Sequence, residues 1–237
     1  MSPNKLSFIR RSLLRWYDRT HRDLPWRRTR DPYAIWIAET MLQQTQVTTV
    51  VPYYERFLKA FPTVEGLDRA PLRKVLALWS GLGYYRRAEG LKKSARKLVR
   101  AHKGKLPQSY EALRDLPGVG DYTAGALLSI AFGKPYPAID GNARRVLGRI
   151  FAINTARKIR DVATRLVPTL RPGYFNQGLM ELGAMICLAK NPRCPECPVA
   201  SHCKSRATRR TFAAKKTQIF KNVTWPLGIV RSSGAIL

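Results

Sequence analysis

The four cysteines of this chain constrain its fold more than any other feature. All four fall within 17 residues of a 237-residue sequence, separated by six, two and five residues. Thiolates this close together are typical of a metal-binding loop, and the spacing alone fits either a zinc ion or a four-iron cluster. Disulfides are less favoured because residues 1–15 lack a secretory signal. The candidate ligands are Cys187, Cys194, Cys197 and Cys203.

Charge indicates the kind of partner. The sequence has 43 Lys and Arg against 15 Asp and Glu, a formal net charge of +28, which implies a polyanion. Basic residues alternate with aromatic ones, as in residues 26–28 and 84–87, and this favours nucleic acid over a membrane surface. A generally basic soluble protein is the alternative.

No segment predicts a membrane anchor. The long uncharged runs, residues 40–54 and 122–133, are shorter than the roughly 20 residues that span a bilayer. We expect a monomer in the cytoplasm, associated with the nucleoid, or in the nucleus if the source is eukaryotic.

Apolar periodicity predicts an all-α fold with a short β fragment at the C-terminus. Residues 224–231 and 234–237 predict a β-hairpin whose second strand stops with the chain, after a basic linker at residues 204–218. Helices are expected near residues 5–18, 34–48, 51–60, 71–80, 84–102, 109–114, 121–132, 142–152, 158–168 and 174–187.

One carboxylate stands apart on the helix expected at residues 34–48. Glu39 is the only charged residue strictly between positions 31 and 55, and apolar side chains occupy more than one face of this helix. Burial would raise its pKa, which suits a general acid near neutral pH. The alternative is a Glu at a solvated edge or paired with a distant Arg. Three amides on the same helix, Gln43, Gln44 and Gln46, could contact base edges or face solvent.

A glycine-rich turn at residues 116–120 precedes the helix expected at 121–132. Gly118 and Gly120, on either side of Val119, permit positive φ and close approach. Backbone N–H groups there could bind a DNA phosphate without reading sequence. A plain corner between two helices is the alternative.

A second candidate carboxylate, Asp140, precedes the helix expected at residues 142–152. It is either a simple N-cap or a catalytic group. The helix N-terminus, with Arg144 and Arg145, would lower its pKa and keep it ionised. One protonated and one ionised carboxyl are the usual pair for cleaving a glycosidic bond.

Taken together, these segments resemble the MutY-type adenine DNA glycosylases, which belong to the helix-hairpin-helix, iron-sulfur group of base-excision enzymes. The resemblance covers about residues 6–206 and rests on motifs that occur in the same order. These are residues 38–47 (AETMLQQTQV), 78–85 (LWSGLGYY), 116–124 (LPGVGDYTA), 140–142 (DGN) and the cysteine loop.

The resemblance implies a role for each candidate residue. Glu39 would protonate adenine at N7, and Asp140 would stabilise the sugar cation with support from Tyr122 and Asn142. The cysteines would hold a 4Fe-4S cluster. The base pocket would comprise Arg22, Leu24, Trp26, Arg27 and Glu181. DNA contacts would come from Gln43, Gln44, Tyr84, Gly118, Val119 and Gly120.

It also implies two lobes with double-stranded DNA between them. Residues 26–137 would form a six-helix barrel lobe that carries the hairpin, and residues 1–25 with 138–206 the cluster lobe. Residues 207–237 would be a linker and the truncated start of a MutT-like domain, the part that checks for 8-oxoguanine. The expected substrate is adenine mispaired with 8-oxoguanine or guanine, removed in base excision repair.

Two alternatives stay open. A related thymine glycosylase or a bifunctional lyase would share the fold, but a lyase needs an amine nucleophile just after the hairpin, where this chain has Tyr122. A non-catalytic DNA-binding protein should lack Glu39 or Asp140, and both are present.

Overall fold

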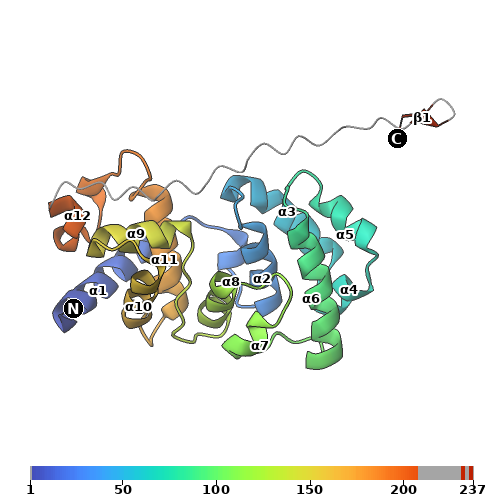
Figure 1. The fold of residues 1–237 in the computed structure, drawn as a ribbon, viewed down its shortest axis with the longest axis horizontal. Helices are drawn as coiled ribbons and strands as arrows, with labels where there is room; N and C mark the ends of the chain where they lie inside the picture. Colours follow the sequence, from blue (N-terminus) through green and yellow to red (C-terminus); the bar gives the residue numbers. More distant parts are fainter. Residues whose placement is uncertain (1, 208–230, 233–234, 237) are drawn as a thin grey trace.

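Helices make up nearly all of the regular structure in this computed structural model, which describes residues 2–207, 231–232 and 235–236 (Figure 1). The predicted all-α fold is confirmed. In chain order the elements are α1 (Pro3–Thr20), η1 (Pro25–Arg27), α2 (Pro32–Met41), α3 (Val47–Ala60), α4 (Val64–Arg69), α5 (Leu72–Trp79), α6 (Arg86–His102), α7 (Tyr110–Arg114), α8 (Asp121–Ala126), η2 (Leu127–Ala131), α9 (Gly141–Phe151), α10 (Ala156–Leu166), α11 (Pro172–Met185), η3 (Cys194–Glu196), η4 (Ala200–His202), α12 (Lys204–Ala207), β1 (Arg231–Ser232) and β2 (Ala235–Ile236).

The helices pack around two hydrophobic cores. One core lies among α2 to α8 and is filled by large aromatic side chains such as Trp36, Phe57 and Trp79. The other joins α1 to α9, α10 and α11 through residues such as Ile9 and Phe175. In Figure 1 the two groups of helices lie side by side along the long axis. The N-terminal helix therefore packs with late elements of the chain, while the lobe boundaries expected from the resemblance stay a prediction.

Local signals set several helix ends. Asp31 accepts hydrogen bonds from the N–H groups of Tyr33 and Ala34 at the start of α2 (3.1 and 3.2 Å), the usual role of an N-cap. Gly133, with φ of 66°, follows η2 and ends the helical run as predicted. Helix α4 was not predicted, because its six residues are too few to establish an apolar period.

The prediction of one helix over residues 34–48 is wrong. Helix α2 ends at Met41, a turn covers residues 42–46, and α3 begins at Val47. The last carbonyl groups of α2 accept hydrogen bonds from Arg87, more than 40 positions further along the chain. A local pattern cannot reveal a cap of this kind.

Smaller differences occur elsewhere. The helix expected at residues 121–132 is divided into α8 and the π-helical turn η2. The first residues of the expected linker form α12, where the Ser205 hydroxyl donates to the Arg149 carbonyl (2.8 Å); the remainder of the linker lies outside the described residues. Strands β1 and β2 pair antiparallel, within the region of the predicted hairpin, whose other residues lie outside the described part.

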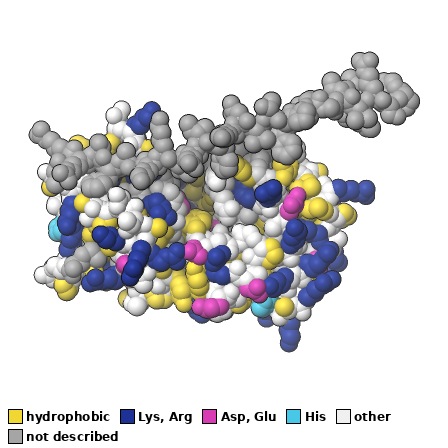
Figure 2. Space-filling model, in the orientation of Figure 1, with side chains coloured by type: hydrophobic (Ala, Val, Ile, Leu, Met, Phe, Trp, Pro, Cys, Tyr) yellow, Lys and Arg dark blue, Asp and Glu magenta, His cyan; other side chains and the backbone are white. Residues whose placement is uncertain are grey.

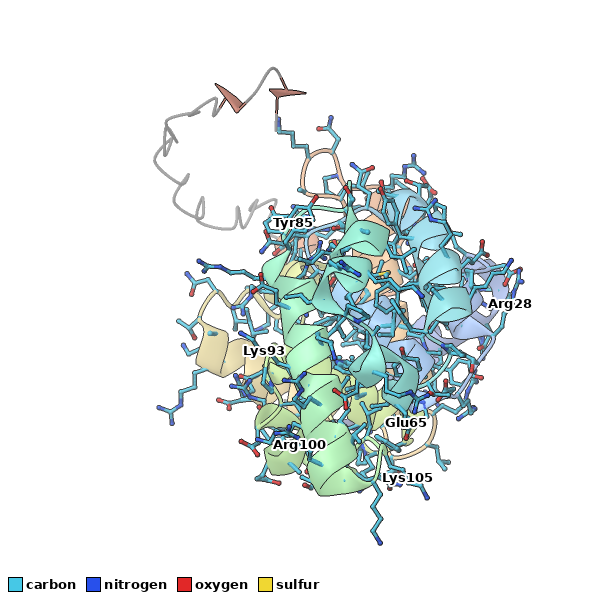
Figure 3. The ribbon with its side chains drawn as sticks, turned by 90° about the vertical axis from the view of Figure 1, so that its right-hand side faces the viewer. Arg28, Glu65, Tyr85, Lys93, Arg100 and Lys105 are labelled. Atoms are coloured by element: carbon cyan, nitrogen blue, oxygen red, sulfur yellow. The ribbon has the colours of Figure 1, made fainter. Side chains whose placement is uncertain are left out.

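Lysine and arginine side chains are spread over the surface, with few acidic ones between them (Figure 2). They continue around the end of the molecule, where Lys93 and Arg100 lie along α6 and Lys105 follows it (Figure 3). Within the described residues, no helix combines the length and apolar character needed to cross a bilayer.

Candidate functional site

A cleft of about 870 Å³ is lined by residues from elements of both cores. Two candidate residues lie outside the lining: Val119, which is buried in the first core, and Tyr84, which is 58% exposed. The candidates that line the cleft are Arg22, Leu24, Trp26, Arg27, Glu39, Gln43, Gln44, Gly118, Gly120, Tyr122, Asp140, Asn142 and Glu181.

Glu39 lies in the last turns of α2 and is only 5% exposed. Its carboxylate accepts a hydrogen bond from the Tyr122 hydroxyl on α8. Burial raises the pKa of Glu39 to about 7; the Tyr122 hydrogen bond opposes this rise, and the charge of Asp140 adds to it. The expectation of a buried carboxyl with a raised pKa is confirmed.

Asp140 is the N-cap of α9, as one of the two interpretations predicts. Its carboxylate accepts hydrogen bonds from the Ala143 N–H (2.6 Å) and the Asn142 amide (3.0 Å). The expected lowering of its pKa is wrong, because burial raises the pKa of Asp140 and outweighs these bonds and the charge of Arg145. Arg144 is exposed and lines a different pocket.

Glu181 on α11 is the second buried glutamate of the cleft, at 1% exposure. It accepts charge-assisted hydrogen bonds from the guanidinium groups of Arg22 (2.8 Å to each oxygen) and Arg27 (3.2 and 2.8 Å). Burial alone would raise the pKa of Glu181, but these bonds outweigh it and lower the pKa to about 2. This carboxylate is therefore permanently ionised at neutral pH.

Sequence reasoning misses much of the α11 wall. Gln177, Met180 and Ala184 line the cleft beside Glu181, at positions that share one helical face with it. Helical periodicity counted from Glu181 would have found them. The other lining residues that were missed are Leu42, Thr45, Val47, Asp121, Thr123 and Gly141.

The hairpin between α7 and α8 packs against α6. Gly118 has φ of 81°, a conformation that favours glycine. It packs closely against Gly90 of α6, because a Cβ added at Gly90 would lie 3.5 Å from the Cα of Gly118. Gly120 does not use the same conformational freedom, since its φ is −89°. A Cβ added at Gly120 would meet nothing within 4 Å, so this side of the hairpin is open to a ligand.

Two loops at the cleft carry exposed side chains on left-handed backbone. Gln44 has φ of 58° and Tyr84 φ of 51°, which few residues other than glycine adopt and which often marks functional sites. The expectation that Gln43 and Gln44 share the helix of Glu39 is wrong, because both lie in the turn after α2. The Gln43 amide donates to the Thr123 hydroxyl (3.2 Å), whereas Gln44 is exposed.

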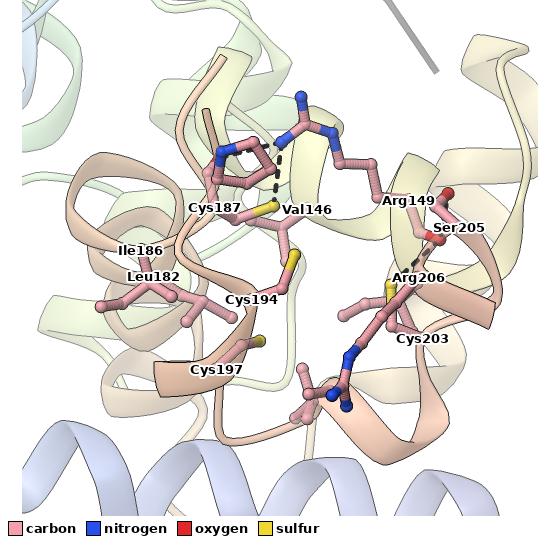
Figure 4. A pocket seen from close by; sticks show the side chains of 14 residues that line it. Val146, Arg149, Leu182, Ile186, Cys187, Cys194, Cys197, Cys203, Ser205 and Arg206 are labelled. Atoms are coloured by element: carbon pink, nitrogen blue, oxygen red, sulfur yellow. Dashed lines mark hydrogen bonds between the residues drawn. The ribbon is translucent and has the colours of Figure 1, made fainter. Parts of the chain in front are cut away.

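The four cysteines line a separate cavity of about 250 Å³ (Figure 4). Arg149 of α9 donates to the Cys187 thiol (3.3 Å) and Arg145 to the Cys187 carbonyl (2.8 Å). In the described part of the chain, no three His, Cys, Asp or Glu side chains are grouped to hold a single metal ion. Four thiols around one cavity fit a tetrathiolate metal site.

Comparison with known families accounts for this combination of features. Residues 37–169 match the family described as HhH-GPD superfamily base excision DNA repair protein. The match includes the hairpin and both Glu39 and Asp140. The chain belongs to the HhH-GPD superfamily.

Among individual relatives in the HhH-GPD superfamily, adenine DNA glycosylases have high sequence identity to this chain. The adenine DNA glycosylase of Homo sapiens is 46% identical over a match that covers 85% of this chain. That of Buchnera aphidicola subsp. Baizongia pistaciae is 44% identical, also over 85% of the chain. The chain spans 40% of the human relative and 59% of the bacterial one. Among solved structures, a thermostable thymine-DNA glycosylase has 32% identity and a TM-score of 0.82; the match covers 86% of this chain and 98% of that one.

The cysteine loop has its own match. Residues 187–203, from the first cysteine to the last, match the iron-sulfur binding domain of endonuclease III, and the predicted iron-sulfur site is confirmed. Cys187, Cys194, Cys197 and Cys203 would hold the cluster in the cavity that they line. When bound, it cross-links the ends of the loop and fixes its fold.

Proposed function

We propose that this HhH-GPD chain is a monofunctional adenine DNA glycosylase. Its substrate is double-stranded DNA in which adenine is mispaired with 8-oxoguanine or guanine, and its products are free adenine and an abasic site. One observation carries the proposal: Glu39 is a buried carboxyl with a pKa of about 7 that lines the same cleft as a second carboxylate, Asp140. The two adenine DNA glycosylases among the relatives support adenine as the base.

The reaction takes place on an adenine that has left the base stack. Extruding a mispaired base costs roughly a few kcal/mol, and the cleft of about 870 Å³ has room for it. Glu39 donates its proton to N7 of the adenine. The C1′–N9 bond then breaks, and its electron pair leaves with the base. Water adds to the oxocarbenium-like C1′, and the proton that water loses restores the protonated Glu39.

The two carboxyl groups divide the work because they have different hydrogen bonds. Like charges in one cleft disfavour the ionisation of both groups. Asp140 accepts bonds from a backbone N–H and from the Asn142 amide, whereas Glu39 accepts one from the neutral phenol of Tyr122. Asp140 is therefore the group that keeps the charge and faces the sugar cation, and Glu39 is the group that holds the proton. Tyr122 and Asn142 orient them.

The remaining cleft residues bind and orient the DNA. Leu24 and Trp26, with the ion pairs between Glu181 and the two arginines, form the wall of the base pocket. Gln44 and Tyr84 enter the duplex beside the extruded base, and Gln43 lies next to them. Backbone N–H groups of Gly118 and Gly120 bind a phosphate, while the Val119 N–H donates to the Leu116 carbonyl (3.1 Å) and holds the hairpin between them; surface cations bind further phosphates. The protein acts as a monomer, at the nucleoid of a bacterium or in the nucleus of a eukaryote.

Two other activities share the fold but have less support from the cleft residues and the relatives. A lyase needs an amine near the sugar, but position 122 is a tyrosine, and no lysine occurs among the described residues that line the cleft. Thymine is the base named for the thermostable structural relative, at 32% identity; the adenine glycosylases are more similar, at 46% and 44%. A non-catalytic role leaves the two cleft carboxyls unexplained.

A single-turnover assay on four duplexes tests the proposal. The duplexes hold adenine opposite 8-oxoguanine, guanine or cytosine, or thymine opposite guanine. We expect release of adenine from the first two and strand breaks only after hot alkali. Release of thymine alone would assign the chain to the related mismatch enzymes. Strand cleavage without alkali, with an adduct trapped by borohydride, would mean that a lysine acts as a lyase nucleophile.

A further inference from the structure

Arg87, the second residue of α6, connects two loops that are distant in sequence. Its guanidinium group makes six hydrogen bonds to neutral acceptors, three through each terminal nitrogen. Nη1 donates to the carbonyl groups of Thr40, Met41 and Gln43 (3.0, 2.7 and 2.6 Å). Nη2 donates to the Thr45 hydroxyl and to the carbonyl groups of Leu82 and Gly83 (3.1, 3.4 and 3.1 Å).

These two loops carry the side chains that would enter the duplex. Gln44 is in the first loop, between two acceptors of Arg87, and Tyr84 directly follows the last acceptor of the second. Both are exposed and both have positive φ. The guanidinium also lies 5.2 Å from the centre of the Tyr84 ring and 5.4 Å from that of Trp79. One side chain therefore contacts both loops directly behind their tips.

An ordinary helix cap does not explain this arrangement. A cation at the C-terminus of α2 is favourable, but a cap needs only the bonds to that helix. In the described part of the chain Arg87 forms no salt bridge, and its buried Nε has no acceptor. A buried donor without an acceptor is unfavourable. The bonds from the two terminal nitrogens to the loops must offset this cost, and they hold the guanidinium group in place.

We propose that Arg87 is a positioning residue that fixes the spacing of the Gln44 and Tyr84 loops, so that both side chains enter the duplex in one step. This inference rests on the proposed function. Loops that are already ordered lose less conformational entropy when they bind. Without the guanidinium fork each loop would be ordered separately, and the adenine would leave the stack less often.

Arg87→Lys tests the inference because an ammonium keeps the charge but cannot span both loops. The probe is a duplex with 2-aminopurine in place of the adenine, whose fluorescence rises when the base unstacks. We expect the unstacking equilibrium, and with it single-turnover release of adenine, to fall roughly tenfold, the fold-change that one net hydrogen bond to a charged group produces. The matched control is Arg86→Lys, at an exposed neighbour, which should behave like the wild type.

A double-mutant cycle separates positioning from plain stabilisation. Gln44→Ala and Tyr84→Ala should be coupled in the wild-type background and nearly additive in Arg87→Lys, because the loops then act independently. A purely structural role would lower the melting temperature and leave the coupling unchanged. Wild-type fluorescence in Arg87→Lys, or coupling that survives the substitution, would overturn the inference.

Thr45→Val keeps the test decisive if Arg87→Lys does not fold. It removes one acceptor of Arg87 and leaves the other five bonds in place, so the unstacking signal should fall in the same direction by a smaller factor. No change would count against the inference. If the wild type itself neither unstacks the base nor releases adenine, the proposed function fails. If the wild type does both and the variants match it, only the role of Arg87 fails.

Discussion

Glu39 and Glu181 are both buried in one cleft, yet their protonation differs. Burial raises the pKa of Glu39 to about 7, whereas two guanidinium groups outweigh burial at Glu181 and lower its pKa to about 2. The difference comes from the partners, since Glu39 accepts a bond from a phenol and Glu181 from Arg22 and Arg27. The same residue type thus has a pKa near neutrality on α2 and stays ionised at neutral pH on α11.

The largest expected effect is the loss of the proposed general acid, Glu39. Glu39→Gln keeps the shape of the side chain but cannot release and regain a proton, so single-turnover adenine release should fall by at least ~10²-fold. DNA affinity should stay the same. Glu55→Gln, the same change at an exposed glutamate of α3, is the control. Near-wild-type release by Glu39→Gln would mean that another group is the acid.

Asp140→Asn should have the next largest effect on the rate. The amide oxygen can still accept from the Ala143 N–H and cap α9, so the melting temperature should change little. The substitution removes the charge that is proposed to face the sugar cation, so adenine release should fall by about 10²-fold. If the variant keeps its activity but melts at a much lower temperature, Asp140 is only a helix cap.

Glu181→Gln should affect stability more than chemistry. It leaves the Arg22 and Arg27 guanidinium groups facing a neutral amide in a buried site, and breaking such a pair should lower the free energy of unfolding by about 3 kcal/mol. Thermal unfolding measures this. The control is Asp18→Asn, whose ion pair with Arg171 is exposed and should contribute less than about 1 kcal/mol. If both substitutions lower the free energy of unfolding equally, the buried ion pairs of Glu181 are no stronger than an exposed one.

At and above neutral pH the rate should depend on the protonation of Glu39. The acid must be protonated, and its pKa is about 7, so adenine release should fall by about tenfold for each pH unit well above that value. Single-turnover rates from pH 5 to pH 9 measure the profile. A rate that stays constant up to pH 9 would contradict the assigned acid.

Stability should also depend on pH, with opposite signs for the two glutamates. Between its ordinary pKa of 4.5 and about 7, Glu39 binds its proton only in the folded state, so its contribution to stability declines as pH rises through this range. Glu181 contributes stability above pH 4.5 that is lost as pH falls toward about 2. Unfolding curves measured at several pH values test this. In Glu39→Gln the decline in stability between pH 4.5 and about 7 should disappear, and the loss below pH 4.5 should remain.

The sequence could predict the surroundings of Glu39 but not those of Glu181. The absence of other charges around Glu39 correctly indicated burial and a raised pKa. The partners of Glu181 lie more than 150 positions away, so only the family resemblance placed them together. The prediction of a lowered pKa for Asp140 was wrong for a related reason. Its N-cap position follows from a local signal and was predicted, but the burial that raises its pKa depends on the surrounding fold. The end of α2 was missed because Arg87 is remote in sequence.

The buried Glu181 pairs have a consequence for the response to ionic strength. Salt screens exposed charges over about 8 Å at physiological strength, so the attraction between a chain of net charge +28 and DNA phosphates weakens as salt is added. Glu181 is 1% exposed, and counterions reach it poorly. Concentrated salt should therefore detach the protein from DNA while the ion pairs of Glu181 in the pocket wall stay intact. The affinity for DNA and the structure of the pocket should thus differ in their dependence on salt.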